Sequence, residues 1–295
     1  MKEGIILKAL SGFYYVEEKE SKRLYTCRSR GLFRKQKITP LVGDDVRFTV
    51  EEDQSGYVME VLERQNELVR PPIANVDCAL VVFSVKEPDF NVKLLDRFLT
   101  VIEHNHIEPI IILTKSDLLS ESEFKAVDEI VQYYREIGYQ TVYTSAKEAL
   151  GLEEVQTVIA DRTVVICGQS GVGKSSLLNA MDINLNLEVN EISKALGRGR
   201  HTTRHVELHK VGEALLADTP GFSSLDLEQL DVEDLSYTFI EFHERSAQCK
   251  FRGCIHDKEP KCAVKEAVET QEFLQSRYDN YQIFLNEIRS RKPKY

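Results

Sequence analysis

The pattern of hydrophobic and polar positions changes twice along the chain. Residues 1–68 contain short, partly alternating runs, GIILKALSGFYYVEE, RLYTCRSRG, DDVRFTVEE and GYVMEVLER, separated by glycine-bearing turns. Short strands in this arrangement predict a small β-barrel of the OB type. The next stretch is VRPPIANVD. Its Pro71 and Pro72 predict a linker without regular structure.

From Cys78 onward, buried strands alternate with helical segments. CALVVFSV, PIIILTKSD, YQTVYTSAK, TVVICGQSG and EALLADTPG each begin with an apolar run, and KLLDRFLTVIEH and FKAVDEIVQYYREIG have helical spacing. This alternation predicts a parallel sheet with helical crossovers. After about residue 228 the pattern becomes mostly helical and polar. We therefore expect a multidomain chain: a barrel over 1–68, an α/β domain over 69–225 and a helical module over 226–295.

A phosphate-binding loop is predicted at residues 168–175, GQSGVGKS, which match G-x-x-x-x-G-K-[ST]. The preceding TVVIC predicts a strand and the following SSLLNAM a helix start, which is the context this motif requires. Lys174 would neutralise the β- and γ-phosphates, and the Ser175 hydroxyl would bind Mg²⁺. The expected contacts are Gly168, Gln169, Ser170, Gly171, Val172, Gly173, Lys174, Ser175 and Ser176.

Two short motifs at strand ends favour guanine as the base, namely TKSD at 114–117 and TSAK at 144–147. The Asp117 carboxylate can accept from the ring N–H and the amine of guanine, a donor pair that adenine lacks. The backbone N–H of Ala146 would reach the guanine O6. Thr114 stands where such motifs usually have Asn, and its hydroxyl can replace part of the lost hydrogen bonding in the loop. The expected base-side contacts are Thr114, Lys115, Asp117, Ser145, Ala146 and Lys147.

Two further segments are expected to sense the γ-phosphate. One is DTPG, with Asp218 near Mg²⁺, through water, and Gly221 near the phosphate. The other is GRGRHTTRH at 197–205, where Thr202 or Thr203 would complete the Mg²⁺ site in the triphosphate state.

The residue after Gly221 bears on hydrolysis. Many GTPases place there a glutamine that orients the attacking water, but this chain has Phe222, which cannot form a hydrogen bond through its side chain. An imidazole can orient water instead, and both His201 and His205 are candidates from the sequence.

The order of the motifs predicts a circular permutation. In ordinary GTPases the phosphate loop comes first and the guanine-reading motifs last, whereas here TKSD and TSAK precede GQSGVGKS and DTPG. The same sheet can be built by joining the old termini and opening new ones, since chain ends often lie close together.

A structural zinc site is predicted at residues 249–262, CKFRGCIHDKEPKC. Three thiolates and one imidazole complete a tetrahedral site with no open position. Disulfides are the rival interpretation, but they would leave an odd thiol, and unligated core cysteines do not fit so polar a stretch. His243 is a possible substitute for the histidine ligand. The expected ligands are Cys249, Cys254, His256 and Cys262, whereas Cys27, Cys78 and Cys167 read as small buried residues.

Composition and charge limit the kinds of binding partner that the chain can have. The formal net charge of −10 excludes a uniformly basic nucleic-acid coat, but a local basic stretch between Ser21 and Gly43 has no acidic residue. With Tyr25 and Phe33 interleaved, it resembles the face with which OB-type barrels bind RNA. We found no signal sequence and no apolar run of membrane-spanning length, and we therefore expect a cytoplasmic protein without a membrane partner. The expected RNA contacts are Lys22, Arg23, Arg28, Arg30, Arg34, Lys35 and Lys37.

Taken together, GQSGVGKSSLLNA, GRGRHTTRH, DTPGF, the cysteine cluster and the permuted order resemble the bacterial ribosome small-subunit-dependent GTPases of the RsgA (YjeQ/YloQ) family over essentially the whole chain. The resemblance implies a monomeric factor that binds the small ribosomal subunit and its rRNA late in maturation. It also implies GTP hydrolysis that the subunit stimulates and that promotes release, with GTP or GDP, Mg²⁺ and one structural Zn²⁺ as cofactors. In this family a histidine of the first switch is implicated in hydrolysis, which by motif position is His201.

Two other functions are compatible with parts of the sequence. One is a guanine-nucleotide-sensing, ribosome-binding module with negligible hydrolysis. The other is an ATP-using RNA remodeller, which Asp117 and Ala146 argue against.

Overall fold

The computed structural model describes residues 1–29, 33, 38–52, 55–69, 71–181, 206–217 and 225–291. The chain forms two compact units, each built from discontinuous segments. The first comprises Met1–Leu80, Leu152–Cys167 and Lys174–Ser223, and the second Val81–Gly151, Gly168–Gly173 and Ser224–Tyr295. The domain limits proposed above at 68/69 and 225/226 stay predictions.

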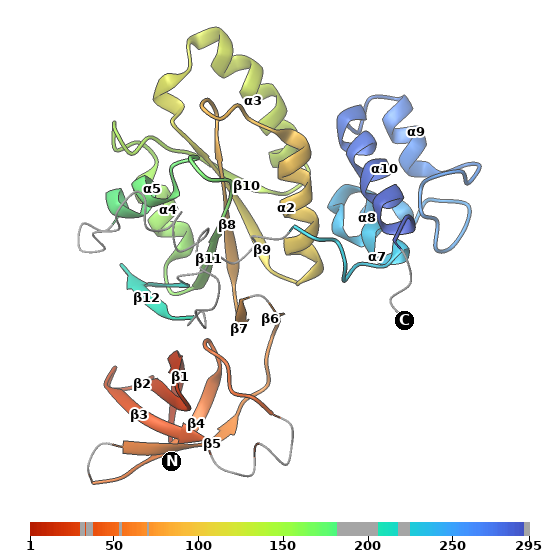
Figure 1. The fold of residues 1–295 in the computed structure, drawn as a ribbon. Helices are drawn as coiled ribbons and strands as arrows, with labels where there is room; N and C mark the ends of the chain where they lie inside the picture. Colours follow the sequence, from red (N-terminus) through yellow and green to blue (C-terminus); the bar gives the residue numbers. More distant parts are fainter. Residues whose placement is uncertain are drawn as a thin grey trace. The chain divides into compact units, whose positions relative to one another are not determined.

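The N-terminal strands close into the expected barrel, in the order β1-β2-β3-β5-β4 (Figure 1). Only β3 and β5 pair in parallel, and the other neighbours are antiparallel. Ile6, Val16 and Phe48 fill the interior with no exposed surface. The strands are β1 (Lys2–Leu10), β2 (Phe13–Glu18), β3 (Leu24–Ser29), β4 (Asp45–Val50) and β5 (Ser55–Val61).

The stretch expected to be an irregular linker contains a two-stranded antiparallel sheet, so that expectation is wrong. Its strands are β6 (Glu67–Val69) and β7 (Pro72–Ala74). Pro72 is tolerated because it opens its strand, where a missing N–H costs little. The Ala74 N–H donates to the Val42 carbonyl at 2.9 Å. A Cβ on Gly43 would lie 2.0 Å from the Ala74 oxygen, so this approach requires glycine.

The central sheet has six strands in the order β10-β9-β8-β11-β13-β12. The pairs β9–β10 and β11–β13 are parallel, and β12 is an antiparallel edge. Every residue of β8 is buried, which explains its continuous apolar sequence. The strands are β8 (Cys78–Ser84), β9 (Glu108–Thr114), β10 (Gln140–Tyr143), β11 (Thr163–Cys167), β12 (Leu208–Val211) and β13 (Ala214–Ala217).

Two helices of the α/β part, α2 and α3, begin at side-chain caps. The Asn91 side chain accepts from the Leu94 N–H at the start of α2, and Ser120 and Glu123 form a capping box at the start of α3. Besides the predicted apolar face of α2, Asp96 is also fully buried, which the helical pattern did not indicate. The helices are α2 (Val92–His104), the 3₁₀ turn η1 (Ser116–Leu118), α3 (Glu121–Glu136), α4 (Leu152–Ile159) and α5 (Lys174–Met181).

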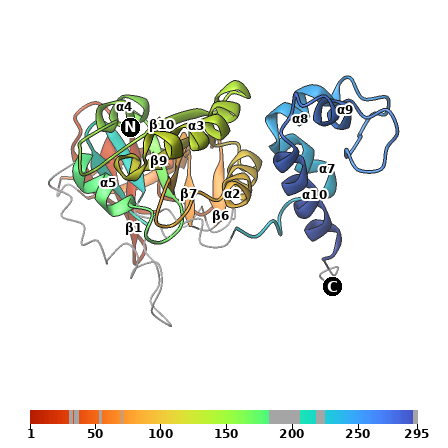
Figure 2. The ribbon, with the colours of Figure 1, turned by 90° about the horizontal axis from the view of Figure 1, so that it is seen from above.

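The C-terminal residues form the expected helical module, in which α8, α9 and α10 gather into one group (Figure 2). Its core is aromatic: the rings of Phe239 and Phe242 stack 5.1 Å apart, and Tyr281 meets Phe239 edge-on. The elements are α7 (Val232–Leu235), η2 (Ser236–Thr238), α8 (Ile240–Ser246), α9 (Ala263–Glu269) and α10 (Gln275–Arg289). Within the described part of the chain, no helix combines the length and apolar character needed to cross a bilayer.

Candidate functional site

The predicted phosphate loop lies between β11 and α5. Gly168, Gly171 and Gly173 all have positive φ angles, which favour glycine. At Gly168 a Cβ would also lie 2.1 Å from the Val82 oxygen. Lys174 and Ser175 begin α5, and each is only 8% exposed. Burial lowers the pKa of Lys174, because desolvation disfavours the charged ammonium form.

The structure brings the two guanine-reading motifs together. The Thr144 N–H donates to the Leu113 carbonyl at 2.8 Å, and the Ser116 N–H donates to the Thr144 carbonyl at 3.2 Å. The Ser145 hydroxyl donates to Asp117 Oδ1 at 2.6 Å, while Lys147 Nζ lies 3.9 Å from Asp117 Oδ2. The carboxylate that would recognise guanine is therefore oriented by residues of the second motif.

Thr114 connects the guanine loop to the phosphate loop. Its hydroxyl donates to the Val172 carbonyl and also lies 3.2 Å from the Phe83 carbonyl, and the residue is only 4% exposed. The hydroxyl thus supplies the loop hydrogen bonding expected for a residue in the usual Asn position. Two of these contacts could not be predicted from the sequence. One is the hydrogen bond from the Thr114 hydroxyl to the Val172 carbonyl, and the other is the hydrogen bond from Lys115 Nζ to the Glu87 carbonyl.

The predicted metal ligands converge in space. The ligand atoms of Cys249, Cys254, His256 and Cys262 all lie within 4.8 Å of one another. The sulfurs of Cys249 and Cys262 are 3.9 Å apart, close to the ~3.8 Å between two thiolates on tetrahedral zinc with bonds of about 2.3 Å. His256 directs Nδ1 toward the cluster, 3.3 Å from the Cys262 sulfur.

The alternatives for this cluster do not fit. None of the six cysteines, all of which lie in the described part of the chain, forms a disulfide, so the disulfide interpretation fails. The substitute ligand His243 is exposed and its ring packs on Tyr237, and it is not part of the cluster. Cys27, Cys78 and Cys167 are buried, as predicted.

The donor chemistry of the cluster suits zinc. Burial lowers the pKa of His256 to about 4, which keeps the imidazole neutral and able to ligate at neutral pH. Burial also raises the pKa of Cys254 to about 12, so its thiolate form needs a cation nearby. The residues therefore fit a tetrahedral Zn²⁺ ion.

The basic stretch of the barrel differs from expectation in its aromatic residues. Lys22, Arg23 and Arg28 are exposed, as an RNA contact requires. Tyr25 and Phe33, expected on the same face, are only 7% and 6% exposed. The alternation of β3 explains Tyr25, because it turns Tyr25 and Cys27 inward and Leu24, Thr26 and Arg28 outward. Arg30, Arg34, Lys35 and Lys37 lie outside the described residues.

Other aromatic side chains lie beside the exposed Arg28. Its guanidinium is 4.8 Å from the ring centroid of Phe13, and Tyr57, its cross-strand partner on β5, is 38% exposed. Sequence reasoning missed Phe13 and Tyr57, because only strand pairing places them next to this basic stretch.

The residues predicted to sense the γ-phosphate and those considered for hydrolysis also fall outside the described residues. The first are Thr202, Thr203, Asp218 and Gly221, and the second are His201, His205 and Phe222.

Family models match most of the chain. The model described as RsgA N-terminal domain matches residues 3–58, and the model described as RsgA GTPase matches residues 61–228. Together they span the barrel and both sets of nucleotide-binding motifs.

Curated relatives align with the chain from end to end. One is 55% identical to it over 100% of both chains and is named small ribosomal subunit biogenesis GTPase RsgA 2, from Oceanobacillus iheyensis. Another, from Bacillus subtilis, is 54% identical over 100% of both chains and is named small ribosomal subunit biogenesis GTPase RsgA.

Solved structures agree with the fold. YloQ, described as a circularly permuted GTPase, has a TM-score of 0.88 and 50% identity over 100% of this chain and 97% of that one. YjeQ from Thermotoga maritima has a TM-score of 0.88 and 37% identity over 99% of both chains. The likeness thus extends over the barrel, the α/β part and the helical module, and the chain belongs to the RsgA family of GTPases.

Proposed function

We propose that this GTPase binds the small ribosomal subunit and acts late in its maturation, with hydrolysis that the subunit stimulates and that promotes release. The observation that carries the proposal is a connected nucleotide site in a chain whose full-length relatives are named for small-subunit biogenesis. Thr114 joins the guanine loop to the phosphate loop, and Ser145 joins the second guanine motif to Asp117 of the first. The test is to measure GTP turnover by the protein alone, with small subunits and with large subunits. We expect turnover to rise only with small subunits.

Three groups of residues would contact the nucleotide. The loop 168–173 offers backbone N–H groups to the phosphates, and Lys174 offers an ammonium group whose burial favours pairing with an anion. Asp117, oriented by Ser145, would accept from guanine. Mg²⁺, when bound by Ser175, Thr202 or Thr203 and, through water, Asp218, supplies positive charge against the phosphate oxygens.

The remaining proposed contacts complete the same site. They are Gln169, Ser170, Ser176 and Gly221 on the phosphate side and Lys115, Ala146 and Lys147 on the base side.

His201 is the proposed water-orienting residue, because Phe222 offers no polar group for this role. Activation of this kind by a docked partner amounts to roughly 10³–10⁵-fold in related GTPase systems. We predict that His201→Ala keeps GDP binding and subunit binding but loses stimulated turnover, and His205→Ala is the matched control. Full stimulated turnover in His201→Ala would remove this histidine from the mechanism.

The protein is proposed to work as a monomer that contacts rRNA through its basic barrel face and holds one structural Zn²⁺ ion. The exposed side chains of Lys22, Arg23 and Arg28 and the metal-compatible cysteine cluster support these assignments. Nucleotide binding without any turnover on small subunits would instead favour the nucleotide-sensing module, an alternative that Phe222 motivates.

A further inference from the structure

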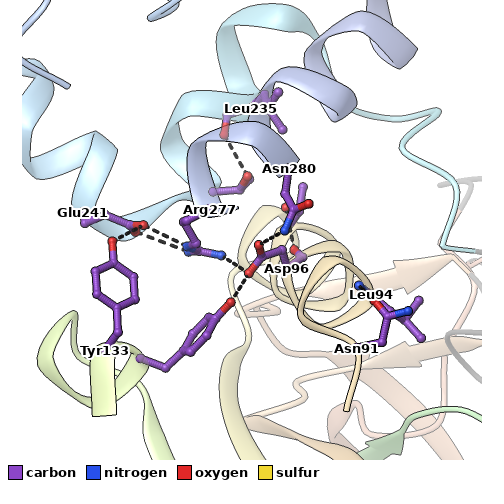
Figure 3. Close-up of polar contacts among 11 residues, drawn as sticks. Asn91, Leu94, Asp96, Tyr133, Leu235, Glu241, Arg277 and Asn280 are labelled. Atoms are coloured by element: carbon purple, nitrogen blue, oxygen red, sulfur yellow. Dashed lines mark hydrogen bonds and ion pairs between the residues drawn. The ribbon is translucent and has the colours of Figure 1, made fainter. Parts of the chain in front are cut away.

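A buried ionic cluster joins the C-terminal module to the helices of the α/β part (Figure 3). Its centre is Arg277 of α10, which is 1% exposed. The guanidinium donates through Nη1 to Asp96 Oδ1 of α2 at 2.6 Å. It also donates through Nε to Glu241 Oε1 of α8 at 2.8 Å. One arginine thus holds carboxylates from both sides of the junction.

Other side chains complete the cluster. Tyr134 of α3 donates its hydroxyl to Asp96 Oδ1 at 2.5 Å, and Asn280 donates to Asp96 Oδ2 at 2.7 Å. The hydroxyl of Tyr133 donates to Glu241 at 3.3 Å. The ring of Phe239 lies 4.4 Å from the guanidinium carbon. Any arrangement that separates these groups would leave charges buried and unpaired, at a high cost in free energy. The cluster therefore favours one geometry of the junction.

The module side of this junction is tied to the metal cluster. Tyr278 and Tyr281 of α10 donate their hydroxyls to the carbonyls of His256 and Ile255 at 2.8 Å and 2.7 Å. The helix that carries Arg277 is therefore anchored at the loop that carries a metal ligand.

The α/β side leads to the phosphate loop. The ring of Phe98, on the same helix as Asp96, packs edge-on against the ring of Phe83 on β8, with centroids 5.8 Å apart. The Phe83 carbonyl lies 3.2 Å from the hydroxyl of Thr114, which donates to Val172 of the phosphate loop. A continuous series of packed and hydrogen-bonded groups therefore runs from Arg277 to the loop that would cradle the phosphates.

We propose that Arg277 is a positioning residue that acts on the nucleotide site through α2 and Thr114. Nucleotide binding and the ordering of the C-terminal module are then energetically coupled. This inference rests on the proposed nucleotide site. By linkage the effect is reciprocal: a nucleotide that stabilises the phosphate loop also stabilises α10.

The first test uses the unaltered protein. Amide hydrogen exchange is measured with and without saturating GDP and Mg²⁺. Protection in α8 and α10 is expected to rise about fivefold or more, in the range typical of coupled sites. Amides of β1 and β2 in the barrel serve as the internal control, and we expect them to change by less than twofold. Equal protection of α10 with and without GDP would overturn the inference.

The second test removes the junction. Arg277→Met and the nearly isosteric Asp96→Asn are each expected to weaken GDP binding about fivefold or more, by the same coupling. Arg289→Met is the matched control, because Arg289 is also an ion-paired arginine of α10, but an exposed one. A purely structural role would disturb α10 and leave GDP affinity unchanged. If Arg277→Met does not fold, Asp96→Asn decides the question.

The outcomes separate the two proposals. Failure of the unaltered protein to bind GDP would overturn both the nucleotide site and the coupling. Normal GDP binding that Asp96→Asn does not change would overturn only the role of Arg277.

Discussion

The hydroxyl of Thr114 reaches backbone groups from two other parts of the fold, the end of β8 and the phosphate loop. A threonine supplies a single donor here, whereas an asparagine would supply two. The hydrogen bond to Val172 is therefore the contact that lets threonine stand at a position where asparagine is usual. Removing the hydroxyl of Thr114 tests whether this contact holds the phosphate loop.

Thr114→Val should weaken GDP binding about tenfold, because a buried carbonyl loses its donor at a cost of about 1–3 kcal/mol. Titration with a fluorescent GDP analogue measures the effect. Thr114→Ser keeps the hydroxyl and is expected to stay within about threefold of the unaltered protein. Equal affinity of the Val and Ser variants would show that the hydroxyl does not hold the loop.

Glu103 shows how burial changes the behaviour of one carboxyl group. Burial raises its pKa to about 7, with the negative charge of Glu241 acting in the same direction and Arg277 acting against it. The folded protein therefore binds a proton there that the unfolded chain releases near pH 4.5. The free energy of unfolding should then fall as the pH rises from about 4.5 to 7, and level off above that range.

Glu103→Gln should remove this slope. At pH 8 the variant is expected to be more stable than the unaltered protein by about 1–3 kcal/mol, since the amide carries no charge to desolvate. Denaturant unfolding at several pH values measures the difference. Glu129→Gln, an exposed position on α3, is the control and should follow the unaltered protein throughout. Parallel stability curves for Glu103→Gln and the unaltered protein would refute the assignment.

At the scale of elements, the helices and most strands follow from local patterns, but their partners do not. The helical spacing predicts α2 and most of its buried face, with Leu94 half-buried and the other predicted positions buried, namely Leu95, Phe98, Leu99 and Ile102. The same pattern gives no sign that Asp96 is buried, because its partner Arg277 lies 181 positions away. The strand β7 was missed for a related reason, since its pairing with β6 outweighs the turn signal of Pro71 and Pro72.

Removal of the metal should destabilise the helices α9 and α10 before the rest of the fold. The four predicted ligands lie in or next to a loop that Tyr278 and Tyr281 connect to α10, so loss of the proposed zinc should expose the amides of α9 and α10 to exchange. Structural zinc contributes on the order of 10–16 kcal/mol in zinc peptides, which exceeds the stability of a small module.

A zinc-selective chelator with Mg²⁺ in excess, followed by hydrogen exchange, tests this prediction. Protection in α9 and α10 should fall at least tenfold, while the barrel strands β1–β5 stay protected. Cys249→Ser should reduce bound zinc from about one ion per chain to none by elemental analysis. Unchanged exchange after complete zinc removal would show that the cluster does not stabilise the module.

The whole molecule combines a net charge of −10 with exposed basic side chains on its barrel. Such a distribution should make the proposed binding to the small subunit depend on a few phosphate contacts and on salt. The described contributors are Lys22, Arg23 and Arg28, all exposed.

Replacing Lys22, Arg23 and Arg28 together by Gln should weaken subunit binding and reduce the salt slope by up to about three ions, with about one ion for each phosphate contact. Affinity measured between about 50 and 200 mM salt gives the slope. The control replaces Lys93, Lys125 and Arg135, which lie on α2 and α3, and is expected to leave the slope unchanged. An identical slope for the barrel variant would remove this face from the interface.

The sequence by itself determined the barrel and the permuted order, and it predicted the phosphate loop, the guanine-reading motifs and the metal ligands, because each is written in residues close together or in their order. Only the tertiary structure decided that Thr114 donates to Val172, that Tyr25 faces the barrel core and that Arg277 binds Asp96. These contacts join residues far apart in the chain, or depend on which face of a strand turns inward. Both are set by the packing of whole elements against one another.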